Sequence, residues 1–397
     1  MPTFSIIVPA YNVQDYIEEA LTSIAGQSFV DFEAIIVDDG STDATGAIAQ
    51  VFCVRDSRFR YIHQPNRGQS TARNVGTAVA SGTYLYYMDS DDIIDADTLD
   101  LCFREFTRQD IDVVMFEASA FPVDAPTYKR EENSYLRPVG KSPLWSEEFV
   151  IESLRQKRYF VSPCCLIAHR SAVGELRFID GIVYEDNHFF VALLLEKRLR
   201  VGVLNQRLFK RRLRSNSTMF EKKTLHHYNS MYRLVHEMSE LSFGALEPPE
   251  RAKIRNKIMG KTLGDLHFAS SLVGPDIKMR IMNVAATWHV ATHISLRLFT
   301  AKRLLLALVP EIYRLQTQAR FNPMLEEGNM RRLEAGVGVG AAPIATEPVC
   351  RPSPERTAAS QMSAFAVALQ AHCGETPGDY PALHALSVAQ YRTFWRC

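Results

Sequence analysis

The chain has 397 residues, of which 46% are hydrophobic, and its 45 basic and 45 acidic side chains cancel in net charge. This length and composition suit two or three domains with a substantial core, which excludes an intrinsically disordered protein. Residues 1–100 hold 5 Lys and Arg against 15 Asp and Glu, whereas residues 201–320 hold 20 against 8. The acidic start favours a metal site. The basic residues 201–320 could bind phosphates, an anionic membrane or the acidic residues 1–100. Alternatively, they form a solvated helix face.

The cysteine pattern and the apolar runs predict a cytoplasmic protein. The seven cysteines form no CxxC pair and no regular framework, so neither a zinc ribbon nor a disulfide scaffold is indicated. The first apolar run, Phe4–Pro9, is too short for a secretory signal and is followed at once by polar residues. No stretch reaches the roughly 20 apolar residues of a membrane-spanning helix, because Arg297, Lys302 and Arg303 interrupt the best candidate.

The first hundred residues predict alternating strands and helices. Phe4–Val8 and Ala34–Val37 are short, apolar and β-branched, as in strands that are buried on both faces of a parallel sheet. Between them, apolar residues recur at helical spacing, and acidic residues stand near the helix start, where the helix dipole favours them. Further helices are expected at Thr45–Phe52 and Ser70–Ala80, and a further strand at Thr83–Met88.

Acidic residues follow two of the predicted strands, at Asp38–Asp43 and at Asp89–Asp92. An α/β sheet binds ligands beyond the carboxyl ends of its strands, so both clusters lie where a ligand is expected. The three carboxylates of the second cluster repel one another by roughly 4 kcal/mol per close pair at an effective dielectric near 20. A hard divalent cation with oxygen ligands would neutralise them. Alternatively, either cluster is an acidic turn that caps a helix.

Four motifs follow one another in the first hundred residues, at Ile6–Asn12, Val37–Asp43, Asn66–Gly76 and Asp89–Asp92. Their order and spacing resemble the family 2 glycosyltransferases with a GT-A fold, and the resemblance covers about residues 3–220. It implies an α/β domain at 1–220 with a Rossmann-like, mostly parallel sheet flanked by helices.

The resemblance also implies roles for the residues at the strand ends. It assigns Asp39 to a uracil-like base, with Asp38 near it, and puts Arg73 near the nucleotide of a sugar donor; alternatively, Arg73 forms an ordinary salt bridge. Other donor-binding residues expected at the first strand are Pro9, Tyr11 and Asn12.

The second acidic cluster matches the DxD motif of the family, which holds a divalent cation on the nucleotide diphosphate. Asp91 is the expected ligand of Mg²⁺ or Mn²⁺, with Asp89 toward the ribose and Asp92 supporting or sharing the ion. These ions suit so few carboxylates because phosphate oxygens and water complete their coordination shell.

Two later segments resemble the family more loosely. Phe178–Phe190 contains an acidic pair ahead of an aromatic residue, which implies that Asp186 is the general base; Glu185 is the alternative, and both residues otherwise merely begin an apolar helix. A base is needed because a sugar hydroxyl attacks poorly until its proton is removed.

The second loosely matching segment is a basic stretch of the form R-x-R-x-x-S, matched by Arg212, Arg214 and Ser217. It is expected either to cover the diphosphate or to form a basic surface loop. His226 and His227 match an additional metal ligand of some relatives by position alone, and a surface or core role is favoured for both.

The rest of the chain predicts helices and a tail. Residues 118–142 read as an irregular insertion near the acceptor site. The helical region at 221–325 is expected to hold Leu225–Leu241, Arg251–Leu272 and a run near Ile281–Leu315. Within that run, Ser295–Arg314 forms a basic amphipathic pattern that lies either on an anionic membrane leaflet or against the core.

Residues 326–397 predict a linker and a poorly ordered or vestigial tail. The stretch Phe365–Trp395 resembles the N-terminal fragment of an acetoacetate-type acyl-CoA synthetase. About thirty residues are too few to fold alone or to carry that chemistry.

Together these features predict an inverting hexosyltransferase. It would transfer a sugar from a UDP- or dTDP-sugar to a hydroxyl of a growing lipopolysaccharide, capsule or exopolysaccharide, with no nucleic acid involved, and it would work in the cytoplasm or peripherally on the inner membrane. One alternative is a non-catalytic sugar-nucleotide-binding or scaffolding protein of the same fold. Another is a nucleotidyltransferase, which would need a lysine in a glycine-rich loop near the first strand, whereas residues 1–54 contain no lysine.

Overall fold

The computed structural model describes residues 1–122, 134–213 and 222–311. These all belong to the first of the two units into which the chain divides, residues 1–329 and 330–397. Arg214, Ser217 and the predicted tail at 326–397 lie outside the described residues, as do residues 123–133 of the predicted insertion and the end of the last predicted helix.

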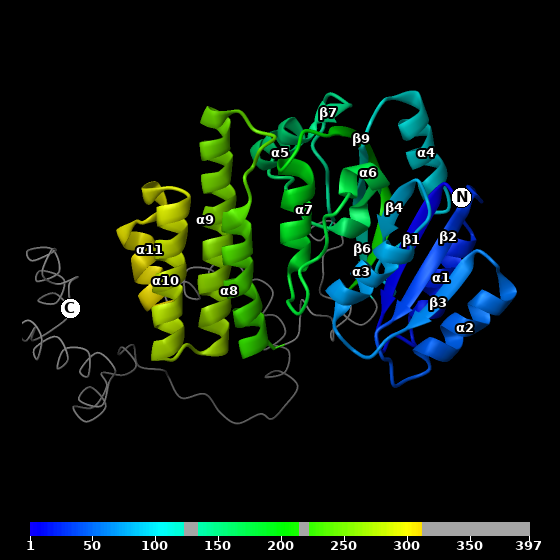
Figure 1. Ribbon diagram of the computed structural model, residues 1–397, viewed down its shortest axis with the longest axis horizontal. Helices are drawn as coiled ribbons and strands as arrows, with labels where there is room; N and C mark the ends of the chain where they lie inside the picture. The colour runs from blue at the N-terminus through cyan, green and yellow to red at the C-terminus, as the bar shows by residue number, and fades with distance from the viewer. Residues whose placement is uncertain (123–133, 214–221, 312–397) are drawn as a thin grey trace, which may run out of the picture. The chain divides into compact units, whose positions relative to one another are not determined.

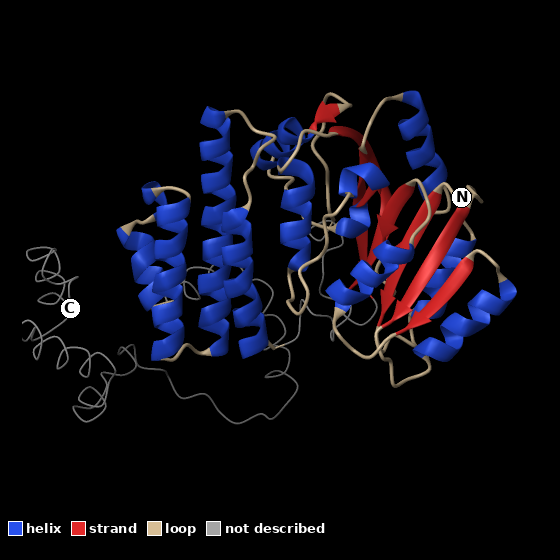
Figure 2. Ribbon diagram, viewed as in Figure 1, coloured by secondary structure: helices blue, strands red, loops and turns tan. Residues whose placement is uncertain are grey.

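A nine-stranded sheet forms the centre of the fold (Figure 2). Its strands are β1 (Phe4–Ala10), β2 (Phe32–Asp38), β3 (Phe59–His63), β4 (Tyr84–Tyr87), β5 (Ile93–Ile94), β6 (Val113–Pro122), β7 (Leu144–Trp145), β8 (Leu166–His169) and β9 (Arg200–Leu213). They lie in the order β3-β2-β1-β4-β8-β6-β9-β5, and β7 pairs with β9.

Strand pairing is parallel in one part of the sheet and mixed in the other. β3, β2, β1 and β4 pair in parallel, as the alternation of strands and helices predicts. β8 is antiparallel to both β4 and β6, while β6 and β9 are parallel. The predicted α/β sheet with flanking helices is confirmed. It is mixed rather than mostly parallel, because the shorter strands β5, β7 and β8 all return antiparallel to their neighbours.

Helices cover both faces of the sheet. They are α1 (Ile17–Ala25), α2 (Thr45–Arg55), α3 (Gln69–Val79), α4 (Thr98–Arg108), α5 (Ser146–Arg155), α6 (Arg170–Val173), α7 (Glu185–Leu195), α8 (Leu225–Glu240), α9 (Pro248–Val273), α10 (Ile277–His293) and α11 (Ala301–Leu308), with 3₁₀ turns η1 (Pro163–Cys165) and η2 (Leu296–Leu298). Because successive side chains of a strand point to opposite faces, Ile7 joins the core under α3 and α7, whereas Ile6 and Val8 join the core under α1 and α4.

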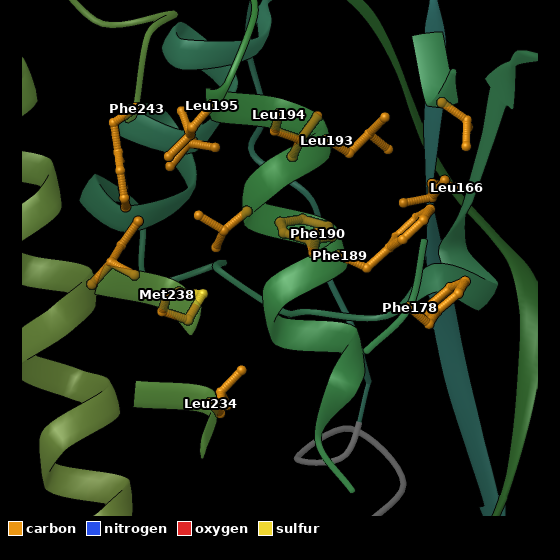
Figure 3. Packing of buried hydrophobic residues seen from close by; sticks show 14 of the residues in the cluster. Leu166, Phe178, Phe189, Phe190, Leu193, Leu194, Leu195, Leu234, Met238 and Phe243 are labelled. Atoms are coloured by element: carbon orange, nitrogen blue, oxygen red, sulfur yellow. The ribbon is translucent and has the colours of Figure 1, made fainter. Parts of the chain in front are cut away.

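Helix α7 connects the sheet with the helical region that follows it (Figure 1). After its polar first turn, every residue from Phe189 to Leu195 is apolar and buried, as expected of a helix that is buried all round. Figure 3 shows Phe189 and Leu193 directed toward Phe178 and Leu166 on the sheet side, and Leu195 on the other side near Phe243. The sheet and helices α8 to α10 therefore share one hydrophobic core through α7.

The helical region confirms two predicted helices closely and divides the third. α8 and α9 match Leu225–Leu241 and Arg251–Leu272 within three residues at each end. The predicted run Ile281–Leu315 is instead α10, η2 and α11, because the side chains of Ser295 and Thr300 accept main-chain N–H bonds and start new turns there. Within the described residues, no helix is both long enough and apolar enough to span a membrane.

Candidate active site

The carboxyl ends of β2, β1 and β4 meet at one edge of the sheet, and the predicted donor-side residues gather there. Asp39 directly follows β2 and is buried. One of its carboxylate oxygens, Oδ1, accepts hydrogen bonds from Gln64 Nε2 at 2.6 Å and from the Arg67 main-chain N–H at 2.9 Å. The other, Oδ2, accepts one bond from the Gly68 N–H at 2.7 Å. Asp39 therefore shapes the 64–68 loop and retains lone-pair capacity on Oδ2 for a further donor.

Asp38 stabilises the turn after β2 from inside the protein. Its Oδ1 accepts the Ser41 N–H at 2.9 Å, and its Oδ2 accepts the Tyr61 hydroxyl at 2.6 Å. Burial alone would raise the pKa of Asp38, but the bonds from Ser41 and Tyr61 favour the ionised form and lower that pKa below its ordinary value. Asp38 is thus an ionised anchor of the turn, committed to neighbours within the protein.

The end of β1 forms the neighbouring wall. Pro9 is buried within the strand, while Tyr11 is exposed. Asn12 has a left-handed backbone with a φ of 50°, and its Oδ1 accepts the Thr42 N–H at 2.9 Å. The loop after β1 is therefore tied to the loop after β2, and Tyr11 is left available at the surface of the site.

Arg73 connects the donor side with the acceptor side. It lies on α3, is 2% exposed, and donates from Nη2 to Asp89 Oδ1 at 2.8 Å and from Nη1 to Glu185 Oε1 at 2.5 Å. Burial alone would lower the pKa of Arg73, but the carboxylates of Asp89 and Glu185 raise it, so the guanidinium stays charged. The guanidinium also lies over the Phe178 ring, 5.0 Å from its centroid. The ion pair predicted as the alternative for Arg73 exists, and both of its partners are candidate site residues.

The three carboxylates after β4 have different surroundings. Asp89 is one-third exposed and is held by Arg73 and by Gln69 Nε2. Asp92 is 4% exposed and accepts the Arg212 main-chain N–H at 2.6 Å. Its pKa is raised well above the ordinary value, first by burial and then by the charges of Asp91 and Asp89. The raised pKa favours the neutral form of Asp92, whereas Asp91 keeps part of its surface exposed.

These surroundings fit a divalent cation that takes few ligands from the protein. Over the residues that the structure describes, no group of three His, Cys, Asp or Glu side chains forms a complete metal cage. Mg²⁺ and Mn²⁺ on a diphosphate need only one or two carboxylates. Asp89 and Asp91 retain exposed surface, whereas the buried Asp92 supports the loop through its bond to Arg212.

Arg212 lies beneath the acidic cluster at the end of β9. Its Nε donates to the Asp91 main-chain carbonyl at 2.7 Å, and its Nη2 pairs with Glu19 of α1 at 2.5 Å. The guanidinium lies over the rings of Tyr16 and Phe121, with centroids at 5.2 and 4.7 Å. Within the described residues Arg212 therefore fixes the backbone of the Asp91 loop. Arg214 and Ser217, its predicted companions, lie beyond the end of β9 and outside the described part.

The acidic pair begins α7 as predicted, and its two members differ in their contacts. Glu185 is 7% exposed and bound to Arg73. Asp186 is only half-buried, and its Oδ1 accepts the Asn187 side-chain amide at 3.0 Å. Its pKa is raised to about 7, first by burial and then by the charge of Glu185. A carboxylate with this pKa can accept a proton near neutral pH.

Several residues that position the site were not predicted from sequence. Gln64 and Glu19 hold Asp39 and Arg212. Asp180 accepts bonds from Thr71 and Asn74 of α3 at 2.9 and 3.1 Å, which binds the segment before α7 to the helix of Arg73. Of these residues, only Asp180 could have been found from the sequence, because the pair Asp180-Gly181 is typical of a turn. Gly181 indeed has a positive φ.

The two histidines considered as metal ligands belong to the start of α8. His226 is exposed, and His227 is buried, where its Nδ1 accepts the Thr224 main-chain N–H at 3.2 Å as a helix cap. This placement agrees with the surface or core role that the sequence favoured for both histidines.

The comparisons with known proteins agree with this fold. Residues 5–177 match the family described as Glycosyl transferase family 2. Glycosyltransferase GlyG of Streptococcus pneumoniae is 29% identical over 228 residues, which are 54% of this chain and 72% of GlyG. Chondroitin synthase of Escherichia coli is 39% identical over 108 residues, 27% of this chain and 16% of that protein. Several other curated relatives are covered over about a third of their length or less.

Among solved structures, residues 1–349 of S. aureus TarS in complex with UDP-GlcNAc resemble this chain with a TM-score of 0.62. The similarity covers 81% of this chain and 92% of that one at 21% sequence identity, so it concerns the fold. It extends well past residue 177, into the helical region. Residues 5–177 of this chain thus match Glycosyl transferase family 2, and the chain shares its fold with TarS.

Proposed function

We propose that this protein transfers a sugar from a UDP- or dTDP-sugar to a hydroxyl of a growing surface glycan, with inversion at the anomeric carbon. The observation that carries the proposal is the position of Arg73 between Asp89 and Glu185. Through this one buried side chain, the acidic loop on the donor side and the acidic pair on the acceptor side belong to a single site.

Asp186 is the proposed general base, and Glu185 is a positioning residue. The Oε1 of Glu185 is committed to Arg73, and its side chain is almost fully buried. Asp186 is more exposed, and its pKa of about 7 suits proton transfer near neutral pH. Asp186 would remove the proton of the acceptor hydroxyl as that oxygen attacks the anomeric carbon, from the face opposite the departing diphosphate.

Asp91 and Asp89 would hold Mg²⁺ or Mn²⁺, with Asp92 supporting the loop. When bound, the ion would neutralise charge that develops on the leaving diphosphate. The protein's own contribution is to fix this loop: Arg212 binds the Asp91 carbonyl and provides the N–H that Asp92 accepts. Arg73 would keep Asp89 oriented toward the donor.

Features of this site and of similar proteins support the choice of donor and acceptor. The free lone pair on Asp39 Oδ2 can accept the imide N–H of a uracil or thymine ring. TarS, which has a similar fold, was crystallised with UDP-GlcNAc, and a relative of the family domain is a chondroitin synthase. We therefore propose a lipopolysaccharide, capsule or exopolysaccharide as the acceptor, extended at the cytoplasmic face of the inner membrane.

A panel of nucleotide sugars tests the proposal. The protein would be incubated with each UDP- and dTDP-sugar and Mn²⁺, and the released nucleoside diphosphate would be measured with and without EDTA. We expect release from one or a few donors, lost with EDTA. Binding of nucleotide sugars without any release would favour the non-catalytic alternative, and release of pyrophosphate from a sugar phosphate and a nucleoside triphosphate would favour a nucleotidyltransferase.

A further inference from the structure

Helix α10 exposes an apolar stripe to solvent. Ile277 and Ile281 are each 62% exposed, and Trp288 is 54% exposed. At 100° per residue these three side chains fall within a sector of about 40° on the helix, with Val284 and Ala285 beside them. Single exposed apolar residues are ordinary, but a continuous stripe marks a surface that meets another partner.

The buried face of α10 contains two polar residues beside the apolar Met279, Ala286, Val290 and Ala291. Asn283 and Thr287 are fully buried in the helical region. Asn283 binds the Tyr228 hydroxyl and Ser270, and Thr287 lies 3.3 Å from the His267 ring nitrogen. Helix α10 therefore has apolar residues on both its inner and its outer face. Packing within the described part of the chain leaves those of the outer face exposed.

Exposed apolar side chains also occur on η2 and α11, which both pack against α10. The Trp288 and Phe299 rings pack nearly at right angles, with their centroids 5.3 Å apart. Leu296 is 69% exposed, and Leu305 and Leu308 are 36% and 39% exposed. We call these exposed residues of α10, η2 and α11 the outer apolar face: Ile277, Ile281, Trp288, Leu296, Leu305 and Leu308. Figure 1 shows that α10 and α11 lie at the edge of the helical region farthest from the sheet.

The charge around this face is mostly positive, with the exposed Asp276 and Glu311 at its two ends in the sequence. Residues 277–310 contain five Lys and Arg and no Asp or Glu. Lys278, Arg297 and Lys302 are exposed beside the outer apolar face. Arg280 pairs with Glu311, and Arg303 donates to the Leu298 carbonyl at 3.2 Å. The exposed cations therefore lie next to exposed aliphatic and indole side chains, without an acidic residue between them in the sequence.

We propose that the outer apolar face binds the surface of an anionic lipid bilayer. The hydrophobic side chains would enter the boundary between headgroups and acyl chains, Trp288 would lie at headgroup level, and Lys278, Arg297 and Lys302 would meet lipid phosphates. A second copy of the chain fits less well, because a two-fold interface places the same surface against itself and would bring these cations together. This inference concerns a separate surface and does not depend on the proposed transfer reaction.

Vesicle sedimentation of the full-length protein tests it. The vesicles would be phosphatidylcholine alone or an equimolar mixture with phosphatidylglycerol. The apolar variant Ile281→Ser/Trp288→Ser and the charge variant Arg297→Gln/Lys302→Gln would be compared with Val51→Ser/Val54→Ser. This control removes two exposed apolar residues from α2, on the other part of the protein.

We expect the unmodified protein and the α2 control to bind the anionic vesicles and not the neutral ones, and added salt to weaken the binding. The charge variant should bind about fivefold more weakly per basic residue removed, and the apolar variant about tenfold more weakly. Equal binding by all four proteins, or none by the unmodified protein, would overturn the proposal. So would a dimer of the unmodified protein in light scattering that Trp288→Ser dissociates without any change in vesicle binding. Because donor turnover is measured separately, failure here leaves the transferase proposal intact.

Discussion

Arg73 and Glu185 are 112 residues apart in the chain, yet their side chains meet at 2.5 Å in a site where both are buried. The same guanidinium holds Asp89, so a cation on α3 orients one carboxylate on each side of the site. This pairing distinguishes the two members of the acidic pair, because it commits Glu185 to Arg73 and leaves Asp186 the more accessible.

A double-mutant cycle tests the Arg73–Glu185 pair. Arg73→Gln leaves the buried carboxylate of Glu185 uncompensated, and Glu185→Gln removes one partner of a buried cation; each should lower the free energy of unfolding by about 3–5 kcal/mol. The loss of unfolding free energy in the double variant should be smaller than the sum of the losses in the two single variants, by about 1–3 kcal/mol. Urea unfolding measures all three. Strict additivity would mean that the two side chains do not interact in solution.

The pH dependence of turnover tests Asp186 as the base. Since its pKa is raised to about 7 and the base must be ionised, the rate of the unmodified protein should fall about tenfold per pH unit below that value. Asp186→Asn should lower turnover by about 10²–10⁴-fold, and the remaining turnover should no longer depend on pH between about 5 and 8. Glu185→Gln is the comparison: if it abolishes the pH profile while Asp186→Asn preserves it, the roles are reversed.

Stability should depend on pH through the same group. The folded protein keeps Asp186 protonated up to a pKa of about 7, whereas the ordinary value is 3.8, so ionising this carboxyl costs stability as pH rises through that window. Asp186→Asn removes this cost. The free energy of unfolding of the variant, relative to that of the unmodified protein, should therefore be about 1–3 kcal/mol higher at pH 8 than at pH 4. Thermal melts at the two pH values measure the difference. A gain that is larger at pH 4 contradicts the assignment.

Asp91→Asn tests the metal ligand. Loss of this carboxylate should lower turnover by about 10²–10³-fold, because charge on the leaving diphosphate would go uncompensated, while the melting temperature stays within a few degrees. Nucleoside diphosphate release measures the effect. Asp97→Asn is a matched control, because Asp97 is exposed in the same loop region and its side chain makes no capping bond to α4. Equal activity in both variants would remove Asp91 from the mechanism.

Arg212→Gln tests whether the Arg212 side chain holds the acidic loop in the shape that binds the metal ion. It removes the bond to the Asp91 carbonyl and should lower the affinity for Mn²⁺ by about 10–100-fold, as loss of a residue that orients a ligand does. Glu19→Gln removes only the partly exposed partner of Arg212 and should have little effect. Titration of Mn²⁺ against turnover compares them. Unchanged Mn²⁺ dependence in Arg212→Gln would show that the loop keeps its shape without this contact.

The sequence was most informative where each element carries its own local pattern. β1, β2 and the helix α1 between them are short and regular, with apolar residues at strand or helix spacing, so their positions could be predicted closely. β9 could not, because Asn205 to Arg207 interrupt it with polar residues and its pairing with β6 depends on residues almost ninety positions away. Likewise, the acidic residues were identifiable by type, but the commitment of Glu185 to Arg73 and of Arg212 to Glu19 follows only from the tertiary fold.

The double-sided packing of α7 has a consequence for protein engineering. A shortened protein ending at residue 220 would keep every candidate catalytic side chain described above. However, Phe190, Leu194 and Leu195 would lose their neighbours on α8 and the helices that follow. Water would then reach the helix whose first turn carries the acidic pair. Anyone seeking a minimal soluble transferase should therefore cut after the helical region, and chimeras that exchange acceptor preferences should move α7 together with the helices it packs against.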